Sequence, residues 1–313
     1  MNDKGLLGAT HPFSRLILLI LLSLTGVFAT VTVGMLIAAP VFGGEAIQLI
    51  LSGEGGQLAG NLNFARYLQV LSHIGLFIIP SIVFAWLVGK RPLLYLGANQ
   101  PPFFLNMALV ALLMLIALPL VNFLININEN LSLPEFLHRM ETWMRLKEER
   151  AMAATRLFLE VTGWQALFFN LFMIAIIPAV GEEFVFRAII QKELGRWSGN
   201  VHLAVWLSAI LFSAMHLQFF GFLPRLALGV ILGYQLVLTR NIWVPVFAHF
   251  FNNAAAVTIY YLKHNGYITI EIENVGLGTG AVFYATASLA AILLVFFLLR
   301  RNNKNKGSVS NGF

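Results

Sequence analysis

Residues 16–35 read LILLILLSLTGVFATVTVGM, a run of 20 residues without a charged side chain. A helix of about 20 apolar residues spans the hydrocarbon core of a bilayer. The run exceeds the 7–15 apolar residues of a secretory signal peptide, so it predicts a retained membrane span. Of the 313 residues, 58% are hydrophobic and 11% are charged, against roughly 25% charged in soluble proteins. The sequence therefore predicts an all-α, polytopic transmembrane helix bundle and excludes a soluble enzyme.

Comparable apolar runs recur along the whole chain, and their lengths are those of membrane helices. They predict eight spans at 16–39, 67–88, 104–125, 163–185, 201–220, 222–239, 243–262 and 279–299.

The net charge of +6 is best explained by Lys and Arg in loops on the cytoplasmic side, and nucleic-acid binding is not expected. With an inside N-terminus, inside segments hold 12 Lys and Arg and outside segments hold eight, five of them in one loop. We expect a multi-pass protein of the plasma (inner) membrane of a bacterium, with both termini cytoplasmic. The chain has no cysteine, so disulfides and thiolate chemistry are excluded.

Residues 133–162 differ from the predicted spans because apolar and charged side chains alternate there. Met140 and Trp143 lie among charged residues, and Glu141 and Arg145 have the i,i+4 spacing of a helical ion pair. This pattern predicts an amphipathic helix on the membrane surface. It is either a solvated connector or a lid that guides substrate.

Ionisable residues within apolar helices are functional hypotheses by default, because each costs several kcal/mol unless it is paired. Glu182, Glu183 and Arg187 follow an apolar run directly. Glu183 and Arg187 share a helix face and can pair, whereas Glu182 points about 100° away and keeps no such partner. An unpaired carboxylate in an apolar setting suits a general base or acid. A helix end with a salt bridge is the alternative.

Two later helices contribute histidines. His216 lies in the predicted fifth span, where a lone histidine is usually a hydrogen-bonded core residue. His249 and Asn253 share a helix face at i,i+4. Their N–H groups can stabilise an oxyanion, or they can simply bond neighbouring helices. Together with the glutamates, these groups can activate water and hold a tetrahedral intermediate. Asp3 is the only aspartate, which excludes an intramembrane aspartyl protease.

The order of these residues resembles the CPBP family of CAAX-processing and bacteriocin-processing intramembrane proteases (Abi proteins), which includes Rce1-like prenyl-protein endopeptidases. The resemblance covers residues 164–261, about a third of the chain. It rests on three motifs: Glu182-Glu183-x-x-x-Arg187, Phe212-x-x-x-His216 and His249-x-x-x-Asn253.

The resemblance implies hydrolysis of a peptide bond inside the bilayer, in a membrane-associated or prenylated protein or peptide. Glu182 would activate water with help from His216, and Glu183 and Arg187 would support the site. His249 and Asn253 would form the oxyanion hole. The implied substrate pocket would be shaped in part by Phe212.

Metal dependence is left open by the sequence. Glu182, His216 and His249 could hold a catalytic Zn²⁺ with water at the open position. No His-Glu-x-x-His segment is present. We favour a glutamate mechanism without metal and keep zinc as the alternative.

The motifs also divide the chain into six segments. These are an N-terminal segment at 1–15, spans one to three at 16–132, the amphipathic connector at 133–162, a catalytic core with spans four to seven at 163–262, a loop and last span at 263–300, and a disordered basic tail at 301–313.

Two rival functions use the same residues. A transporter or channel would line a proton or substrate path with them, and a catalytically silent scaffold or immunity protein would keep them without using them. One difficulty concerns depth, since His216 lies about 22 Å into span five while Glu182 lies near the end of span four. For the motifs to meet, span five must begin later than 201 or the site must be a deep cavity.

Overall fold

The computed structural model describes residues 5–51 and 62–304, and every regular element of this part is helical. The prediction of an all-α membrane bundle is therefore confirmed. The longer helices are α1 (Pro12–Leu51), α2 (Leu62–His73), α3 (Ile79–Gly89), α5 (Phe104–Ile116), α6 (Leu118–Glu129), α7 (His138–Leu159), α11 (Val201–Met215), α12 (Phe222–Thr239), α13 (Trp243–His264) and α14 (Ala281–Lys304).

Short elements connect or interrupt these helices. They are the π-helical turns η2 (Ile74–Ile78), η4 (Leu171–Ile176) and η5 (Phe184–Gln191), the 3₁₀ turns η3 (Glu135–Leu137), η6 (Phe219–Gly221) and η7 (Ile272–Asn274), and the short helices α4 (Pro92–Tyr95), α8 (Trp164–Asn170), α9 (Ile177–Glu183) and α10 (Lys192–Ser198).

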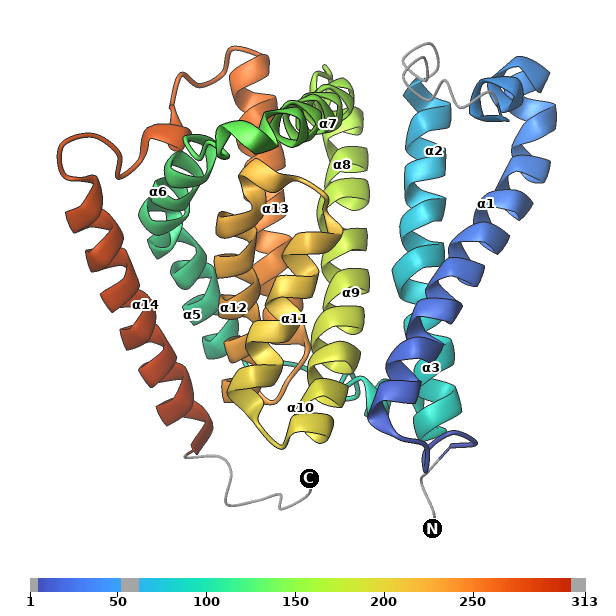
Figure 1. Ribbon diagram of the computed structural model, residues 1–313, viewed down its shortest axis with the longest axis horizontal. Coiled ribbons are helices and arrows are strands. Elements are labelled where there is room, and N and C mark those ends of the chain that lie inside the picture. The colour runs from blue at the N-terminus through green and yellow to red at the C-terminus, as the bar shows by residue number, and fades with distance from the viewer. Residues whose placement is uncertain (1–4, 52–61, 305–313) are drawn as a thin grey trace.

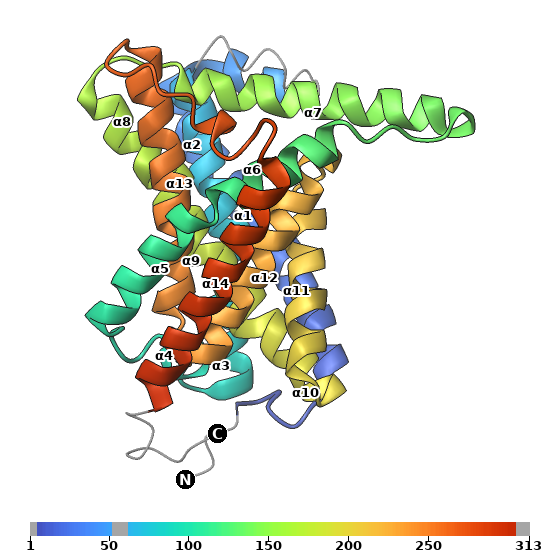
Figure 2. The same cartoon turned by 90° about the vertical axis from the view of Figure 1, so that its left-hand side faces the viewer.

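The helices form one bundle whose centre holds α9, α11, α12 and α13 (Figure 1). The helices α1 to α3 flank the centre on one side, and α5, α6 and α14 flank it on the other. The described chain begins and ends at the same end of the bundle, and α7 lies across the opposite end (Figures 1 and 2). We call these the terminal end and the α7 end of the bundle.

Each predicted span overlaps one or more helices, but the predicted number of eight spans is approximate. Among the described residues, five helices are long and apolar enough to cross a membrane, at Pro12–Gly43, Leu62–Gly89, Trp164–Ser198, Phe219–Thr239 and Ala281–Asn303. A sixth span forms if α5 and α6, bent by 41°, count as one. The bend falls before Pro119, which lacks the N–H that a continuous helix needs.

The helical stretch Trp164–Ser198 corrects the predicted end of span four at residue 185. It ends at Gly199, whose φ of 64° is the left-handed conformation typical of a helix C-terminus. Asn200 then caps α11 by accepting hydrogen bonds from the N–H groups of His202 and Leu203. These two capping residues, rather than the fall in hydrophobicity after 185, set the boundary.

The longer helix explains how two of the motifs meet. Glu182 lies 16 residues before Ser198, which at 1.5 Å per residue is about 24 Å. Helix α11 leaves the same terminal end and carries His216 at its far end, about 22 Å away. The two side chains therefore reach the same depth, and span five does not need to begin later than 201.

The two ends of the chain differ slightly from the predicted segments. Helix α1 begins at Pro12 rather than at residue 16, so the predicted N-terminal segment is shorter. In the predicted tail, 301–304 are the last residues of α14, and the rest of the tail lies outside the described residues. The predicted connector contains a 22-residue helix, α7.

Helix α7 contacts the bundle near its middle and at its C-terminal end, where the Phe158 carbonyl accepts a hydrogen bond from the Asn170 amide at 2.6 Å. The Glu148 carboxylate accepts a hydrogen bond from the N–H of Phe220 (2.9 Å), and the Arg145 guanidinium lies 4.2 Å from the centre of the Phe220 ring. Glu141 pairs with Arg145 as predicted, at 2.7 Å. The N–H of Leu133 and the Arg145 guanidinium lower the pKa of Glu141, so this carboxylate stays ionised. Helix α7 thus lies on the loop that directly follows His216.

A second charged cluster fixes the terminal end. The buried Glu193 carboxylate pairs with Arg15 of α1 at 3.1 Å and with Arg196, and it accepts a hydrogen bond from the Tyr95 hydroxyl. Burial and the Glu193 carboxylate raise the pKa of Tyr95, which therefore remains a donor. The Lys192 ammonium donates to the Tyr95 carbonyl at 2.7 Å. This cluster, which we call the terminal clamp, joins α1 and α4 to α10.

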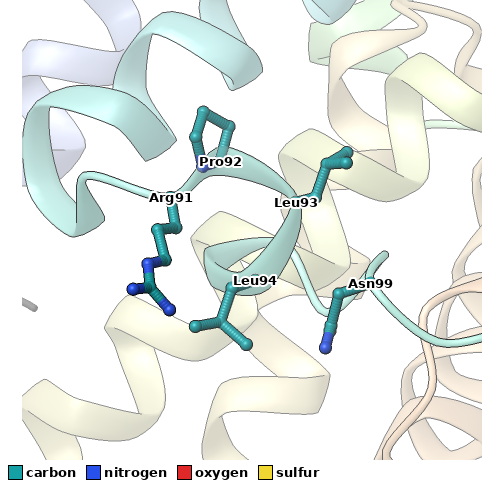
Figure 3. Close-up of a pocket in the computed structure, with 5 residues that line it drawn as sticks. All are labelled: Arg91, Pro92, Leu93, Leu94 and Asn99. Carbon is teal, nitrogen blue, oxygen red and sulfur yellow. The ribbon is translucent and has the colours of Figure 1, made fainter.

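Figure 3 shows a pocket of about 400 Å³ beside the terminal clamp, around the short helix α4. None of the motif residues lines it. Its lining residues are Arg91, Pro92, Leu93, Leu94 and Asn99.

Gly75 of η2 allows α1 to pack closely against the second span. A Cβ atom built on Gly75 would lie 2.8 Å from the Gly26 carbonyl oxygen and would overlap the Thr30 hydroxyl. We expect Gly75→Ala to lower the free energy of unfolding by about 1–3 kcal/mol, as overpacking does elsewhere. Thermal unfolding in detergent measures the change.

Gly195→Ala is the matched control for that substitution. Its Cβ would meet the Ala204 Cβ at 3.7 Å, which is ordinary van der Waals contact, and it lies within helix α10. An equal melting temperature for the two variants would contradict the close packing at Gly75.

Candidate active site

The centre of the site is an ion pair that is fully removed from solvent. The Glu183 carboxylate lies 3.0 Å from the Arg187 Nε, and both side chains are 0% exposed. The pair has the i,i+4 geometry expected from the sequence, on consecutive turns at the junction of α9 and η5. A buried ion is tolerated only when it is paired, so the removal of either residue would leave the other as an unpaired buried charge.

Arg187 is held by two further groups. Its Nη1 lies 3.4 Å from the Ser208 hydroxyl, and its guanidinium stacks 5.0 Å from the centre of the Phe212 ring. Ser208 donates in turn to the Phe186 carbonyl at 2.8 Å. Phe212, which the sequence predicts to shape the substrate pocket, therefore makes a cation–π contact with the Arg187 guanidinium.

His249 connects α13 to this pair. Its Nδ1 lies 3.0 Å from the other oxygen of Glu183. The Glu183 carboxylate is paired with Arg187 and can only accept hydrogen bonds. Nδ1 of His249 therefore carries a proton and donates a hydrogen bond to Glu183. The Nε2 atom is then the nitrogen that faces Glu182, at 3.9 Å.

Glu182 is held less tightly than its neighbour. Its side chain is 7% exposed, and its two oxygens lie 3.9 Å from the His249 Nε2 and 3.7 Å from the His73 Nε2. Both distances exceed a direct hydrogen bond. The carboxylate thus lies between imidazoles yet retains free lone pairs for a water molecule.

His216 is placed at the end of α11, one turn after Phe212. Its Nδ1 donates to the Phe212 carbonyl at 2.8 Å, because a carbonyl can only accept. The ring of Phe212 meets the rings of His216 and His249 edge-on, with centroid distances of 5.1 and 5.9 Å. His216 also interacts electrostatically with Glu182. One phenyl ring therefore positions both imidazoles.

Asn253 lies one turn after His249 and bonds a backbone group. Its Nδ2 donates to the Ile174 carbonyl at 3.2 Å. Pro178, four residues after Ile174, has no N–H for that carbonyl, and the preceding turn is widened into η4. Asn253 thus satisfies an acceptor that proline leaves free, as polar residues between membrane helices do. Its amide has a second N–H.

Two features of the site were not anticipated from the sequence. His73 reaches the site from α2 and belongs to none of the three motifs. As a lone ionisable residue in the predicted span 67–88, it could have been recognised as a functional candidate. An apolar pocket of about 320 Å³ lies between α5, α9 and α13, two of which carry site residues, although none of the motif residues lines it. It is lined by Pro102, Met107, Ile176, Ala179, Val180, Trp243, Val246, Phe247 and Phe250.

The zinc alternative gains no support from the arrangement of side chains. Across residues 5–51 and 62–304, no three His, Cys, Asp or Glu side chains form a group that could hold a metal ion. Glu182, His216 and His249 therefore do not fit a metal centre.

Known proteins resemble the region that contains this site. Residues 164–255 match the family model described as "Type II CAAX prenyl endopeptidase Rce1-like". Two relatives come from Bacillus subtilis (strain 168): "Putative membrane peptidase YdiL", 27% identical over 38% of this chain and 48% of the relative, and "Uncharacterized protein YpbD", 26% identical over 30% and 48%. The chain thus spans about half the length of these curated relatives.

No solved structure matches the chain. The three motifs all lie within the matched segment. Their resemblance to the Rce1-like family of CAAX prenyl endopeptidases is thereby confirmed over residues 164–255.

Proposed function

We propose that this protein is an intramembrane endopeptidase in which Glu182 activates water. The observation that carries the proposal is the contrast between two adjacent carboxylates. Glu183 is held by Arg187 and His249, whereas Glu182 faces two imidazoles at distances beyond a direct hydrogen bond. A neighbouring pair of carboxylates with different surroundings is a recurrent basis for acid and base roles.

The proposed reaction begins with water bound to the Glu182 carboxylate. Glu182 accepts one proton while the water oxygen attacks the carbonyl carbon of the peptide bond. His216, which faces Glu182, helps to orient the water. The carbonyl oxygen becomes an oxyanion that accepts hydrogen bonds from the Nε2–H of His249 and from the second N–H of Asn253. Because Nδ1 already donates to Glu183, His249 acts here with both ring nitrogens protonated. Protonated Glu182 then returns its proton to the departing amine, which completes the hydrolysis.

Glu183 and Arg187 support the reaction without touching the substrate. Their ion pair fixes the ring of His249 through its Nδ1, which leaves Nε2 directed into the site. Fixed donors cost no reorganisation when charge develops, and this is the main source of electrostatic catalysis.

The substrate that we propose is a membrane-associated or prenylated protein or peptide. The matching family model is described by CAAX prenyl endopeptidase activity. The apolar pocket between α5, α9 and α13 offers about 320 Å³ to a hydrocarbon group. The site also lies at mid-depth of a helical bundle, where a substrate in the bilayer can reach it.

We further propose that the terminal end of the bundle is cytoplasmic and that the protein belongs to a bacterial inner membrane. Basic residues gather at this end, as the positive-inside rule requires. Arg15, Lys192 and Arg196 lie in the terminal clamp there. The α7 end would then face the other side.

Purified protein in liposomes, given a quenched fluorescent lipidated peptide, tests this proposal. Cleavage by the wild-type chain, without pH-dependent ion flux, supports a peptidase. Flux without cleavage would favour the transporter, and neither activity would favour the scaffold.

A chelator provides a separate test of the glutamate mechanism. We expect peptide cleavage to be unchanged after incubation with EDTA or 1,10-phenanthroline, because Glu182 needs no metal to accept the proton of water. Initial cleavage rates before and after chelation are the measurement. Loss of activity that added Zn²⁺ restores would contradict the metal-free mechanism.

A further inference from the structure

His73 brings a titratable group from the N-terminal helices to the site. It is the last residue of α2, and its Nε2 lies 3.7 Å from the Glu182 Oε1. His249 approaches the other oxygen of the same carboxylate to 3.9 Å. Glu182 is thus flanked by one imidazole on each oxygen, and only one of the two belongs to the segment that the family model matches.

The second nitrogen of His73 is held in place by its own helix. Its Nδ1 lies 3.1 Å from the Gln69 amide nitrogen and 3.3 Å from the Gln69 carbonyl. When the amide donates to Nδ1, Nε2 carries the proton and faces the Glu182 carboxylate. The ring also contacts Phe77, with a centroid distance of 5.5 Å.

The local backbone explains why His73 can approach so closely. The π-helical turn η2 begins directly after it, and such turns are common where a helix redirects a functional side chain. On the opposing helix, Gly181 precedes Glu182, and a Cβ built on it would lie 2.8 Å from the Phe77 Cβ. The missing side chain lets α9 pack directly on η2, which brings His73 to Glu182.

We infer that His73 is a positioning residue that holds the Glu182 carboxylate in its ionised, water-binding orientation. The inference rests on the proposed hydrolysis. At 3.7 Å this N–H acts on one oxygen as a nearby dipole rather than through a direct hydrogen bond. It favours the charged carboxylate and leaves the oxygen nearer His249 for water. Because His73 contacts Glu182 rather than the scissile bond, it acts on turnover more than on substrate binding.

The test compares His73→Ala, His73→Gln and His73→Leu in liposomes with the fluorescent peptide. We expect His73→Ala to lower kcat by about 10–100-fold, the range found for groups that orient the ligands of metal sites, while KM changes by less than about threefold. His73→Gln should recover most of kcat, because its amide N–H can face Glu182. His73→Leu fills a similar volume without a donor and should remain as slow as His73→Ala.

His202→Ala is the matched control. His202 is exposed on α11, and its ring bonds Tyr234. We expect its kcat to equal that of the wild type.

The outcomes separate this inference from the proposed function. If the wild type cleaves, Glu182→Gln does not, and His73→Ala keeps full kcat, the inference is wrong and the function stands. If the wild type does not cleave, the proposed function itself fails. Should His73→Ala not fold, equal kcat for the Gln and Leu variants would overturn the role of the N–H group.

Discussion

Glu182→Gln is expected to lower the rate of peptide cleavage by about 10³-fold or more, with no loss of folded protein. General acid–base groups contribute roughly 10²–10⁴-fold, and Glu182 is proposed to act in both proton transfers. Glutamine has the same shape but cannot accept the proton of water. Its amide can still face His249 and His73, so packing around the site is preserved. The measurement is kcat for the fluorescent peptide, together with the melting temperature.

Glu149→Gln provides the matched control for that change. Glu149 is exposed on α7, and the same substitution there should alter neither activity nor stability. Full activity of Glu182→Gln would remove Glu182 from the chemistry and would favour the scaffold hypothesis. Loss of activity together with a large fall in melting temperature would point to a structural role instead.

Arg187→Ala is expected to be the most destabilising single substitution among the site residues. It leaves the Glu183 carboxylate buried without its cation, at a position that is 0% exposed. Removing one partner of a buried ion pair typically costs about 3–5 kcal/mol. We expect a marked fall in the thermal midpoint in detergent and in the yield of monodisperse protein. The additional loss of packing on Phe212 acts in the same direction.

The chain contains a matched pair for comparison. Glu141 and Arg145 on α7 have the same i,i+4 spacing, but Arg145 is 46% exposed. Breaking an exposed pair costs about 0–1 kcal/mol, so Arg145→Ala should leave the midpoint almost unchanged. The double variant Glu183→Gln/Arg187→Met should recover part of the stability, because no buried charge is left unpaired. Equal midpoints for Arg187→Ala and Arg145→Ala would contradict the buried pair.

The sequence was sufficient to predict features that depend on local spacing or on composition. Scarcity of charge identified the membrane bundle, and the i,i+4 rule alone paired Glu183 with Arg187. The same rule placed His249 and Asn253 on one face. It could not show that His249 bonds Glu183, because 66 residues separate them. Contacts of that kind depend on how helices pack and leave no periodic signal.

The fourth predicted span ends earlier than the helix does, for a physical reason. Hydrophobicity falls after residue 185 because four charged residues follow, at Arg187, Lys192, Glu193 and Arg196. Two of these four, Arg187 and Glu193, are buried against partners. A hydropathy window treats each such charge as exposed to lipid. The helix continues past them until Gly199 ends it.

His73 shows a different limit of the sequence. Neighbouring residues give no indication that it faces Glu182, since the two lie on separate helices. Asn253 is similar, because its bond to the Ile174 carbonyl depends on the proline at 178. In both cases the residue type predicts a polar role, but the partner is determined by how the helices pack.

The terminal clamp has a consequence for dissecting this protein into parts. Glu193 belongs to the same helical stretch as Glu182, and its cation and hydroxyl partners include Arg15 and Tyr95. A fragment cut to residues 164–255 would retain all three motifs. It would lose Arg15 and Tyr95, two partners of the buried Glu193 carboxylate, and it would also lose His73. The motif-bearing segment is therefore not expected to reproduce the site by itself, and transplanting it into another membrane scaffold would require helices α1 to α4 to accompany it.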